Sequence, residues 1–423
     1  MKLIVVGGGW AGIAAAVRAC EAGHEVTLLE MAPRLGGRAR SADGAAGTAL
    51  DNGQHILIGA YRETLGLMTR VGCDVDALLA RLPLELRYPD GRGLRLGVGK
   101  AGLLAGLLGA RGLGVGDRLA LTSAMVRWAL AGWRCDARLS VAELCRGLGG
   151  AVRTLLIDPL CVAALNTPAP QASGAVFLRV LHDALLGGAG SSDLLLPRRP
   201  LSELLPEPAT RWLEQAGARL ALGRRVRLVE RDGARWRVDG QLGDAVVLAC
   251  SAAEAARLSE PLAPDWSRQA GTLRYEPIVT VYLRGPGARL PAPMTALVDT
   301  PEAPAQFAFD HGALGGEAAR FAFVVSGAAA WVEAGLDATA AAVLRQARQA
   351  FAPGTWPTAP TLIQALAEKR ATFRCTPGLT RPRAEILPRL VAAGDYVDGA
   401  YPATLEGAVR SGRAALAAIA TPG

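Results

Sequence analysis

The start of the chain alternates between apolar and polar stretches in a way that predicts a strand, a turn, a helix and a second strand. Lys2–Val6 is short and mostly apolar, glycines follow at once, and residues 13–22 have the apolar spacing of a helix. Residues 25–30 form a second apolar run that ends in an acid. Strand, glycine turn and helix in this order are the setting in which a glycine-rich motif indicates a dinucleotide site.

Each glycine of this turn has its own expected role. Gly7 allows the tight turn out of the strand, Gly9 lets a pyrophosphate approach the backbone, and Gly12 lets the helix pack close to the strand. The phosphates would lie on the N–H groups at the start of the helix. Glu30, about twenty residues further on, would accept hydrogen bonds from the ribose hydroxyls. A plain glycine-rich turn with a solvated Glu30 is the alternative, but the register of all the parts favours the nucleotide site.

Apolar periodicity divides the rest of the chain into further segments. Helices are expected at 61–71, 140–148, 176–186, 204–216, 338–350 and 402–420. Strands are expected at 218–222, 225–231, 236–238, 245–249, 273–283, 296–298, 306–309, 322–326, 362–373 and 390–395, with a hairpin in 81–98. Nucleotide-type segments thus occur at both ends and in the middle. This layout predicts a Rossmann-like α/β domain built from 1–75, 197–265 and 380–423, and an α+β domain built from 76–196 and 266–379.

Two apolar regions raise the question of a membrane. Residues 99–135 hold two apolar helical runs, which are either ordinary buried helices or a pair that docks on a bilayer and admits an apolar substrate. Residues 159–178 are uncharged over about the length of a membrane span. They also contain Asn166, Gln171 and three prolines, so a spanning helix is not expected there.

Composition narrows the classes of function. The formal net charge is +8, but the arginines are spread along the chain without a basic stripe. This argues against nucleic acid and leaves a peripheral attraction to anionic lipid open. The seven cysteines are odd in number, widely spaced and without a C-x-x-C, which predicts reduced thiols in a cytosolic protein and no metal site. The glycine motif lies inside the N-terminal apolar run, so this run is not interpreted as a signal peptide.

Two polar stretches follow the second strand. Gly36-Gly37-Arg38 predicts either a turn around a larger cofactor, with the arginine on a phosphate, or a surface turn with a solvated arginine. Residues 50–59 place polar groups between apolar flanks. His55 lies among them, and a lone histidine is more often a satisfied core residue than a catalyst.

Together these segments resemble the superfamily of FAD-dependent amine oxidases and phytoene desaturases. Gly7, Gly9, Gly12 and Glu30 match its FAD fingerprint, and Gly36, Gly37 and Arg38 match the element that follows. The remaining matches are Val226, whose backbone would contact adenine, and Gly394, Asp395, Thr404 and Leu405 of the C-terminal motif. In that motif the resemblance implies that the Asp binds the ribityl or phosphate part and that the helix start faces the flavin ring.

A narrower resemblance lies inside this one. Residues 51–61, 165–168, 192–197 and 368–373 look like the squalene-associated FAD-dependent desaturases, a family understood as hydroxysqualene dehydroxylases. The resemblance covers essentially the whole chain. It departs from the pattern where Val397 replaces a threonine, and in residues 306–311, where Trp and Arg would be typical.

This resemblance implies a reductive dehydroxylation of hydroxysqualene to squalene, as in hopanoid biosynthesis. Water would leave the protonated allylic alcohol, and hydride from N5 of reduced FAD would quench the cation. His55 and Asp310 are the expected substrate-side residues, and Gly53 and Gln54 the expected flavin contacts. Lys369 and Arg370 either stabilise the reduced flavin or are exposed strand charges.

Other functions on the same scaffold remain open. The first is a carotenoid-type desaturase, which would run the flavin oxidatively. An amine oxidase is less favoured because aromatic residues make up only 5% of the chain and no aromatic cage is evident. A non-catalytic flavin-binding partner of terpenoid enzymes belongs to a different class. The expected ligand is a long apolar isoprenoid, the expected partners are enzymes of the squalene and hopanoid pathway, and the expected location is the cytoplasm or the cytoplasmic face of the membrane.

Overall fold

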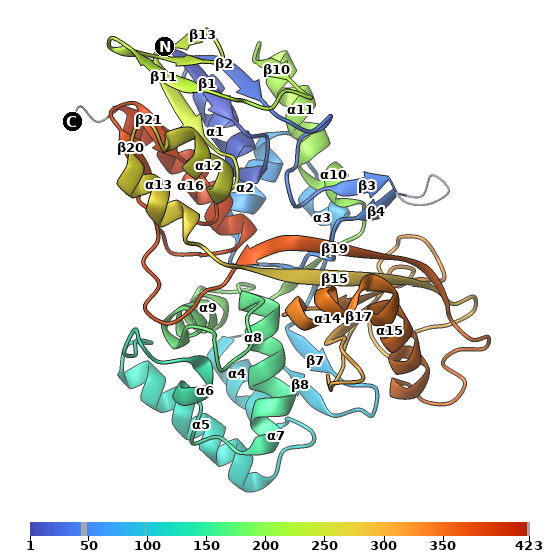
Figure 1. The fold of residues 1–423 in the computed structure, drawn as a ribbon. Coiled ribbons are helices and arrows are strands. Elements are labelled where there is room, and N and C mark those ends of the chain that lie inside the picture. The colour runs from blue at the N-terminus through green and yellow to red at the C-terminus, as the bar shows by residue number, and fades with distance from the viewer. Residues whose placement is uncertain (44–48, 98, 421–423) are drawn as a thin grey trace.

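The computed structural model describes residues 1–43, 49–97 and 99–420. Its first layer is a six-stranded sheet with strand order β10-β2-β1-β14-β21-β20 (Figure 1). The strands are β1 (Lys2–Val6), β2 (Glu25–Leu29), β10 (Arg219–Ala221), β14 (Ala245–Leu248), β20 (Glu385–Leu387) and β21 (Leu390–Ala392). All neighbours are parallel except β20 and β21. Because these strands come from 1–75, 197–265 and 380–423, we propose those stretches as the cofactor domain; their residues 44–48 and 421–423 lie outside the described ranges.

Helices α1 (Trp10–Glu21) and α16 (Leu405–Ala420) pack closely together beside this sheet (Figure 1). Gly412 makes the close crossing possible, because a Cβ there would lie 2.1 Å from the carbonyl oxygen of Ala11. The same lobe holds further short elements. They are α2 (Arg62–Arg70), α3 (Val75–Leu78), α10 (Leu201–Leu204), α11 (Pro206–Gln215), α12 (Ala252–Ser259), α13 (Pro264–Gly271), β3 (Ser41–Asp43), β4 (Ala49–Asp51), β11 (Val229–Asp232), β12 (Arg235–Val238) and β13 (Gln241–Gly243).

The second lobe is built on a five-stranded antiparallel sheet of order β16-β17-β18-β15-β19. The strands are β15 (Tyr275–Arg284), β16 (Met294–Ala296), β17 (Phe307–Asp310), β18 (Arg320–Val325) and β19 (Thr361–Phe373). The long pair β15 and β19 runs between the two lobes, and α15 (Leu336–Ala350) packs against β19, next to α14 (Ala329–Ala334) (Figure 1). The predicted strands of this region are therefore confirmed, with ends shifted by a few residues.

A helical part completes the second lobe, at the bottom of Figure 1. Its helices are α4 (Gly99–Leu108), α5 (Val115–Leu130), α6 (Val141–Leu144), α7 (Gly150–Val152), η2 (Arg153–Ile157), α8 (Asp158–Leu165) and α9 (Gly174–Leu186). Its strands are β6 (Leu79–Leu82), β7 (Glu85–Arg87), β8 (Gly93–Arg95) and β9 (Leu194–Pro197), and β7 and β8 form the predicted hairpin. Strand β9 also pairs with β5 (Leu57–Ile58) of the first lobe. Across the described residues, no helix is both long and apolar enough to cross a membrane.

Two local predictions differ from the structure. The strand expected at 225–231 is present only from Val229, because the N–H groups of Arg227 and Leu228 donate to the carboxylate of Asp239 at 3.0 and 2.9 Å and are not available to a neighbouring strand. The helix expected at 140–148 ends at Leu144, although its N-terminus has the capping box that Ser140 and Glu143 indicate.

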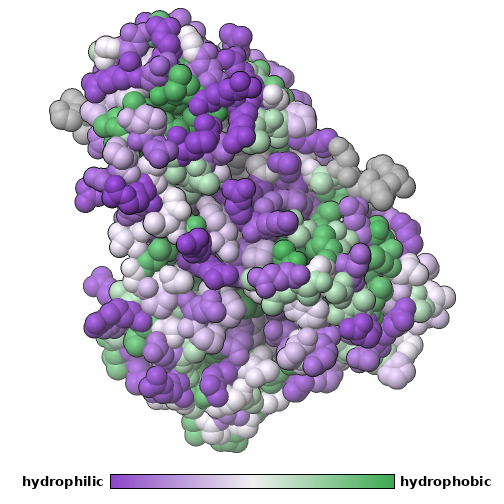
Figure 2. All heavy atoms as spheres, viewed as in Figure 1, coloured by the Kyte–Doolittle hydropathy of each residue, from purple (hydrophilic) through white to green (hydrophobic). Residues whose placement is uncertain are grey.

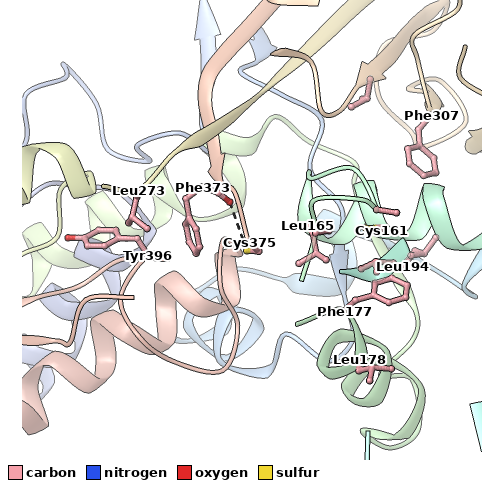
Figure 3. Close-up of a cluster of buried hydrophobic side chains, with 14 of the residues drawn as sticks. Cys161, Leu165, Phe177, Leu178, Leu194, Leu273, Phe307, Phe373, Cys375 and Tyr396 are labelled. Atoms are coloured by element: carbon pink, nitrogen blue, oxygen red, sulfur yellow. Dashed lines mark hydrogen bonds between the residues drawn. The ribbon is translucent and has the colours of Figure 1, made fainter. Parts of the chain in front are cut away.

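The two lobes share one continuous apolar core. In Figure 3, Phe373 and Cys375 at the end of β19 lie between Tyr396 on one side and Leu165 and Phe177 of the helical part on the other. All five side chains are buried. This shared core fixes the substrate lobe against the cofactor lobe, and the candidate site lies where they meet.

Candidate cofactor and substrate site

A cleft of about 770 Å³ opens between the lobes, within the size range of small-molecule sites. It brings together most residues that the sequence proposed for the cofactor, together with the proposed substrate-side residue His55. Those that line it are Gly7, Gly9, Glu30, Gly36, Gly37, Arg38, Gly53, Gln54, His55, Val226, Gly394, Asp395, Thr404 and Leu405. Gly12 lies behind the wall, and Asp310 does not line the cleft.

The glycine turn is tight at two positions and open at a third. Gly7 has a φ of +106°, and a Cβ on Gly12 would lie 1.9 Å from the carbonyl oxygen of Gly7. A Cβ on Gly9 would approach only the Cα of Gly37, at 3.8 Å. The backbone at Gly9 is therefore accessible from the cleft. Helix α1 begins at Trp10, and the first N–H groups of a helix lack partners within it, which suits a bound phosphate.

Glu30 is fixed at the end of β2 by the backbone around it. Its side chain is buried and accepts hydrogen bonds from the N–H groups of Gly8 at 2.6 Å and Ala32 at 2.7 Å. Each carboxylate oxygen has a second lone pair, so Glu30 can also accept from the two hydroxyls of a ribose. The predicted position of this acid next to the glycine turn is thus the observed one.

Arg38 and Asp395 join the two ends of the chain. The Nη2 of Arg38 donates to Oδ1 of Asp395 at 2.5 Å, and its Nη1 donates to the carbonyl oxygen of Ala371 at 2.8 Å. Burial alone would lower the pKa of Arg38, but the charge and hydrogen bond of Asp395 outweigh it and raise the pKa above its usual value. The pair places one positive and one negative group on the same part of the cleft wall.

The cleft also contains a polar atom that the protein leaves without a partner. Oε1 of Gln54 is buried and accepts no hydrogen bond within the described residues. A buried acceptor without a partner costs about 1–3 kcal/mol, so a ligand N–H at this point would be favourable. The pyrimidine part of a flavin offers such a donor. With the open backbone at Gly9, the fixed acid Glu30 and the Arg38–Asp395 pair, the residues of the cleft fit FAD.

His55 lies in the cleft as a neutral imidazole. Its Nδ1 is 2.9 Å from the carbonyl oxygen of Gly53, and because a carbonyl only accepts, Nδ1 carries the proton. Burial lowers the pKa of His55, and the nearby charge of Arg38 lowers it further. The remaining nitrogen, Nε2, therefore carries a lone pair. His55 can accept a hydrogen bond or face a developing cation, but at neutral pH it is not a proton donor.

Asp310 lies on the other side of its strand. Phe307 and Phe309 of β17 line the cleft, and side chains alternate between the two faces of a strand, so Asp310 points away. Its carboxylate is fully buried and accepts from the N–H groups of Leu290 at 3.3 Å and Ala313 at 2.9 Å. This placement gives Asp310 a role in holding two loops, and we do not retain it among the substrate-side residues.

A second, apolar cavity adjoins the cleft. Its wall is formed by aliphatic and aromatic side chains of α4, α5, α8 and α9 together with β5, β7 and β8. Six residues line both spaces: Ile56, Tyr61, Ala163, Ala164, Phe307 and Thr404. Of these, the sequence had indicated only Thr404 for the site. Tyr61 was expected merely to start a helix, although it closes the polar stretch 51–61.

The fold and the cleft define a flavin-dependent oxidoreductase with a two-lobed architecture. The profile of the family "Flavin containing amine oxidoreductase" matches residues 10–420, and the chain belongs to that family. Solved structures share the fold. An oxidoreductase from Methanosarcina mazei superposes with a TM-score of 0.76 at 16% identity, covering 99% of this chain and 100% of that one. Cyclohexylamine oxidase from Brevibacterium oxydans superposes with a TM-score of 0.73 at 17% identity, covering 99% and 98%.

Curated relatives confirm the narrower resemblance. Hydroxysqualene dehydroxylase from Rhodopseudomonas palustris is 28% identical over 430 residues, which is 97% of this chain and 96% of that protein. The protein of the same name from Sinorhizobium fredii is 27% identical over 438 residues, again 97% and 96%. A probable zeta-carotene desaturase from Synechococcus elongatus is 29% identical over 256 residues, 54% of this chain and 51% of that protein. This protein is an FAD-dependent oxidoreductase with squalene-related relatives.

Proposed function

We propose that this enzyme removes the hydroxyl group of hydroxysqualene by reduction and releases squalene. The observation that supports this most directly is the apolar cavity that shares its wall with the cofactor cleft. A long hydrocarbon would lie in that cavity. The cavity holds only about 170 Å³, so such a chain would also occupy part of the adjoining cleft, next to the cofactor.

The residues that line the cleft and the cavity would have separate roles in this reaction. Glu30, the turn at Gly9 and the Arg38–Asp395 pair hold the cofactor, and reduced FAD supplies the hydride when it is bound. The aliphatic wall excludes water, which would otherwise capture a cationic carbon. His55 lines the cleft, and the Nε2 lone pair of its neutral imidazole would stabilise positive charge that develops there.

The second candidate is a carotenoid-type desaturase, favoured by the partial similarity to a zeta-carotene desaturase. Its reaction needs oxidised FAD and a polyene, whereas dehydroxylation needs reduced FAD and an alcohol. Two anaerobic incubations of the purified protein separate the two. We expect squalene from hydroxysqualene with reduced FAD, and no change of phytoene or zeta-carotene with oxidised FAD. The reverse result would assign the protein to the desaturases.

We further propose that α4 and α5 touch a membrane surface. Their outer face carries large apolar side chains that are unusually exposed, including Val115 at 71%, Leu119 at 63% and Leu130 at 84%. Figure 2 shows hydrophobic side chains at the lower end of the molecule, where α5 lies in Figure 1. Over the described part of residues 99–134, Arg111, Arg127 and Arg134 are exposed and no acidic side chain is. Apolar and basic groups together suit an anionic lipid surface.

The inner faces of the same helices line the apolar cavity, through Leu103 and Leu107 of α4 and Leu121, Met125 and Trp128 of α5. A membrane at the outer face would therefore be one helix layer away from the substrate space. This arrangement would let an apolar substrate enter from the bilayer without crossing water.

A double Leu119→Glu/Leu130→Glu variant should bind vesicles containing phosphatidylglycerol at least about tenfold more weakly. Each substitution removes the free energy of burying one leucine side chain in lipid, which is up to about 1.5–3 kcal/mol. Co-sedimentation with vesicles measures this. The matched control is Leu336→Glu/Leu362→Glu, at two leucines that are 37% and 43% exposed elsewhere. Equal weakening by both double variants, or by neither, would contradict a docking face on α4 and α5.

A further inference from the structure

One end of the apolar cavity is polar, unlike the rest of its wall. Of the thirty described residues that line it, only five carry a hydroxyl or carboxylate group: Tyr61, Asp183, Ser192, Tyr401 and Thr404. They come from three segments far apart in the sequence, around residues 61, 183–192 and 401–404. Burying polar groups in an apolar cavity costs free energy unless they hydrogen-bond to a ligand or to one another.

Four of these residues lie close to one another. The hydroxyl of Tyr61 lies near that of Thr404. The Oγ1 of Thr404 donates to the carbonyl oxygen of Tyr401 at 2.9 Å, and the hydroxyl of Tyr401 lies near the carboxylate of Asp183. Ser192 lies next to these residues. The carbonyl oxygen of its neighbour Ser191 accepts a hydrogen bond from the N–H of Ala60 at 3.0 Å, and Ala60 directly precedes Tyr61. The polar groups are therefore gathered in one place.

The protons and lone pairs that each hydroxyl has left decide which of these groups can hydrogen-bond to a ligand. Thr404 uses its single proton on Tyr401, and its oxygen also accepts from the N–H of Gly407 at 2.9 Å. Thr404 therefore has no proton left for Tyr61, and the hydroxyl oxygen of Tyr61 keeps its lone pairs for a ligand. Burial, together with the charge of Glu406, raises the pKa of Tyr61, so the phenol stays protonated at neutral pH.

Asp183 is already occupied. Its carboxylate accepts from Nε of Arg179 at 2.7 Å and lies 2.7 Å from Nδ1 of His182. Burial alone would raise the pKa of Asp183, but these hydrogen bonds outweigh it and hold the pKa below its usual value. The carboxylate of Asp183 thus has partners of its own, and Tyr61 is the hydroxyl best placed to meet a ligand.

The position of Tyr61 is fixed against α16. Tyr61 precedes α2, and the buried carboxylate of Glu406 in α16 accepts from the N–H of Thr64 at 2.9 Å and from its hydroxyl at 2.8 Å. Tyr61 and Thr404 also line the cofactor cleft. The polar end of the cavity is therefore its junction with the cleft.

We propose that Tyr61, supported by Thr404, binds the single hydroxyl group of a long-chain isoprenoid alcohol at this junction. The inference rests on the proposed dehydroxylation and adds the contact that places the reacting carbon beside the cofactor. A hydrocarbon without the hydroxyl has no partner for Tyr61. The site would therefore distinguish the alcohol from the hydrocarbon product and would favour product release.

The test compares Tyr61→Phe with the wild-type holoprotein. Titration with hydroxysqualene and with squalene in detergent micelles is followed by the change in flavin absorbance. We expect Tyr61→Phe to bind hydroxysqualene about tenfold more weakly, with unchanged squalene affinity, since it loses one hydrogen bond to a neutral group. The single-turnover rate with the reduced protein should fall at least as much.

Two variants serve as controls. Tyr88→Phe removes another buried hydroxyl, which donates to the carbonyl oxygen of Leu155 at 3.2 Å and lines neither cavity. It should bind both ligands like the wild type. Thr404→Ser keeps the acceptor and should preserve the discrimination. If Tyr61→Phe binds both ligands as the wild type does, or loses both equally, the hydroxyl site is wrong. A wild type that prefers the alcohol but forms no squalene would instead refute the proposed reaction.

Discussion

A Gly12→Ala variant is expected to purify with roughly a tenth or less of the wild-type flavin content, because forcing one methyl group into a closed space costs about 1–3 kcal/mol or more. The new Cβ would lie 1.9 Å from the carbonyl oxygen of Gly7 and 3.3 Å from the Cβ of Ala249. No side-chain rotation can relieve a clash of Cβ with backbone. Helix α1 would have to move away from β1, and its N-terminus would leave the phosphate position.

Absorbance near 450 nm per protein measures the flavin content of this variant. The matched control is Gly66→Ala. Gly66 lies inside α2, and a Cβ there meets no atom within 4 Å. Alanine is favoured over glycine in a helix by about 1 kcal/mol, so this control should keep its flavin and be slightly more stable. Wild-type flavin content in Gly12→Ala would show that the turn does not hold the cofactor as proposed.

A Glu406→Ala variant should lose at least about 2 kcal/mol of stability, because the two buried donors of Thr64 lose their acceptor at about 1–3 kcal/mol each. Glu406 is fully buried in the first turn of α16. Its carboxylate pairs with Nε of Arg410 at 2.7 Å and accepts the two hydrogen bonds from Thr64. Removing it leaves the guanidinium and the start of α2 without their common partner.

Urea unfolding of the flavin-loaded protein measures this loss. Glu25→Ala is the control, because Glu25 pairs with Lys2 at 3.5 Å on the surface, with 68% and 56% of the two side chains exposed. Exposed pairs contribute about 0–1 kcal/mol, so the control should unfold close to the wild type. An equally small effect of Glu406→Ala would mean that the contact between α2 and α16 does not hold the fold together.

The cofactor part of the site could be predicted because its signals are local. Spacing alone relates Gly7, Gly9, Gly12 and Glu30, and the predicted fold class and FAD as cofactor are both confirmed. The pairing of Arg38 with Asp395 joins residues 357 positions apart. The resemblance placed each of them on the cofactor without pairing them, because no local pattern relates the two ends of a chain.

The substrate side was harder to predict, for two physical reasons. Period-two alternation shows that neighbours in a strand face opposite ways, but not which face meets the cleft, and Asp310 lies on the other face from Phe309. The contact of Tyr61 with Thr404 depends on how α2 packs against α16, which Glu406 fixes by hydrogen bonds. The spacing of residues along the chain predicts neither the face of β17 that meets the cleft nor the contact of Tyr61 with Thr404.

The most direct test of the proposed function adds hydroxysqualene to the dithionite-reduced holoprotein without oxygen, after excess dithionite has been removed. We predict that the flavin absorbance near 450 nm returns and that squalene forms in equal amount, one molecule for each flavin reoxidised. A flavin that stays reduced with hydroxysqualene unchanged, in a protein that binds FAD, would contradict the assignment.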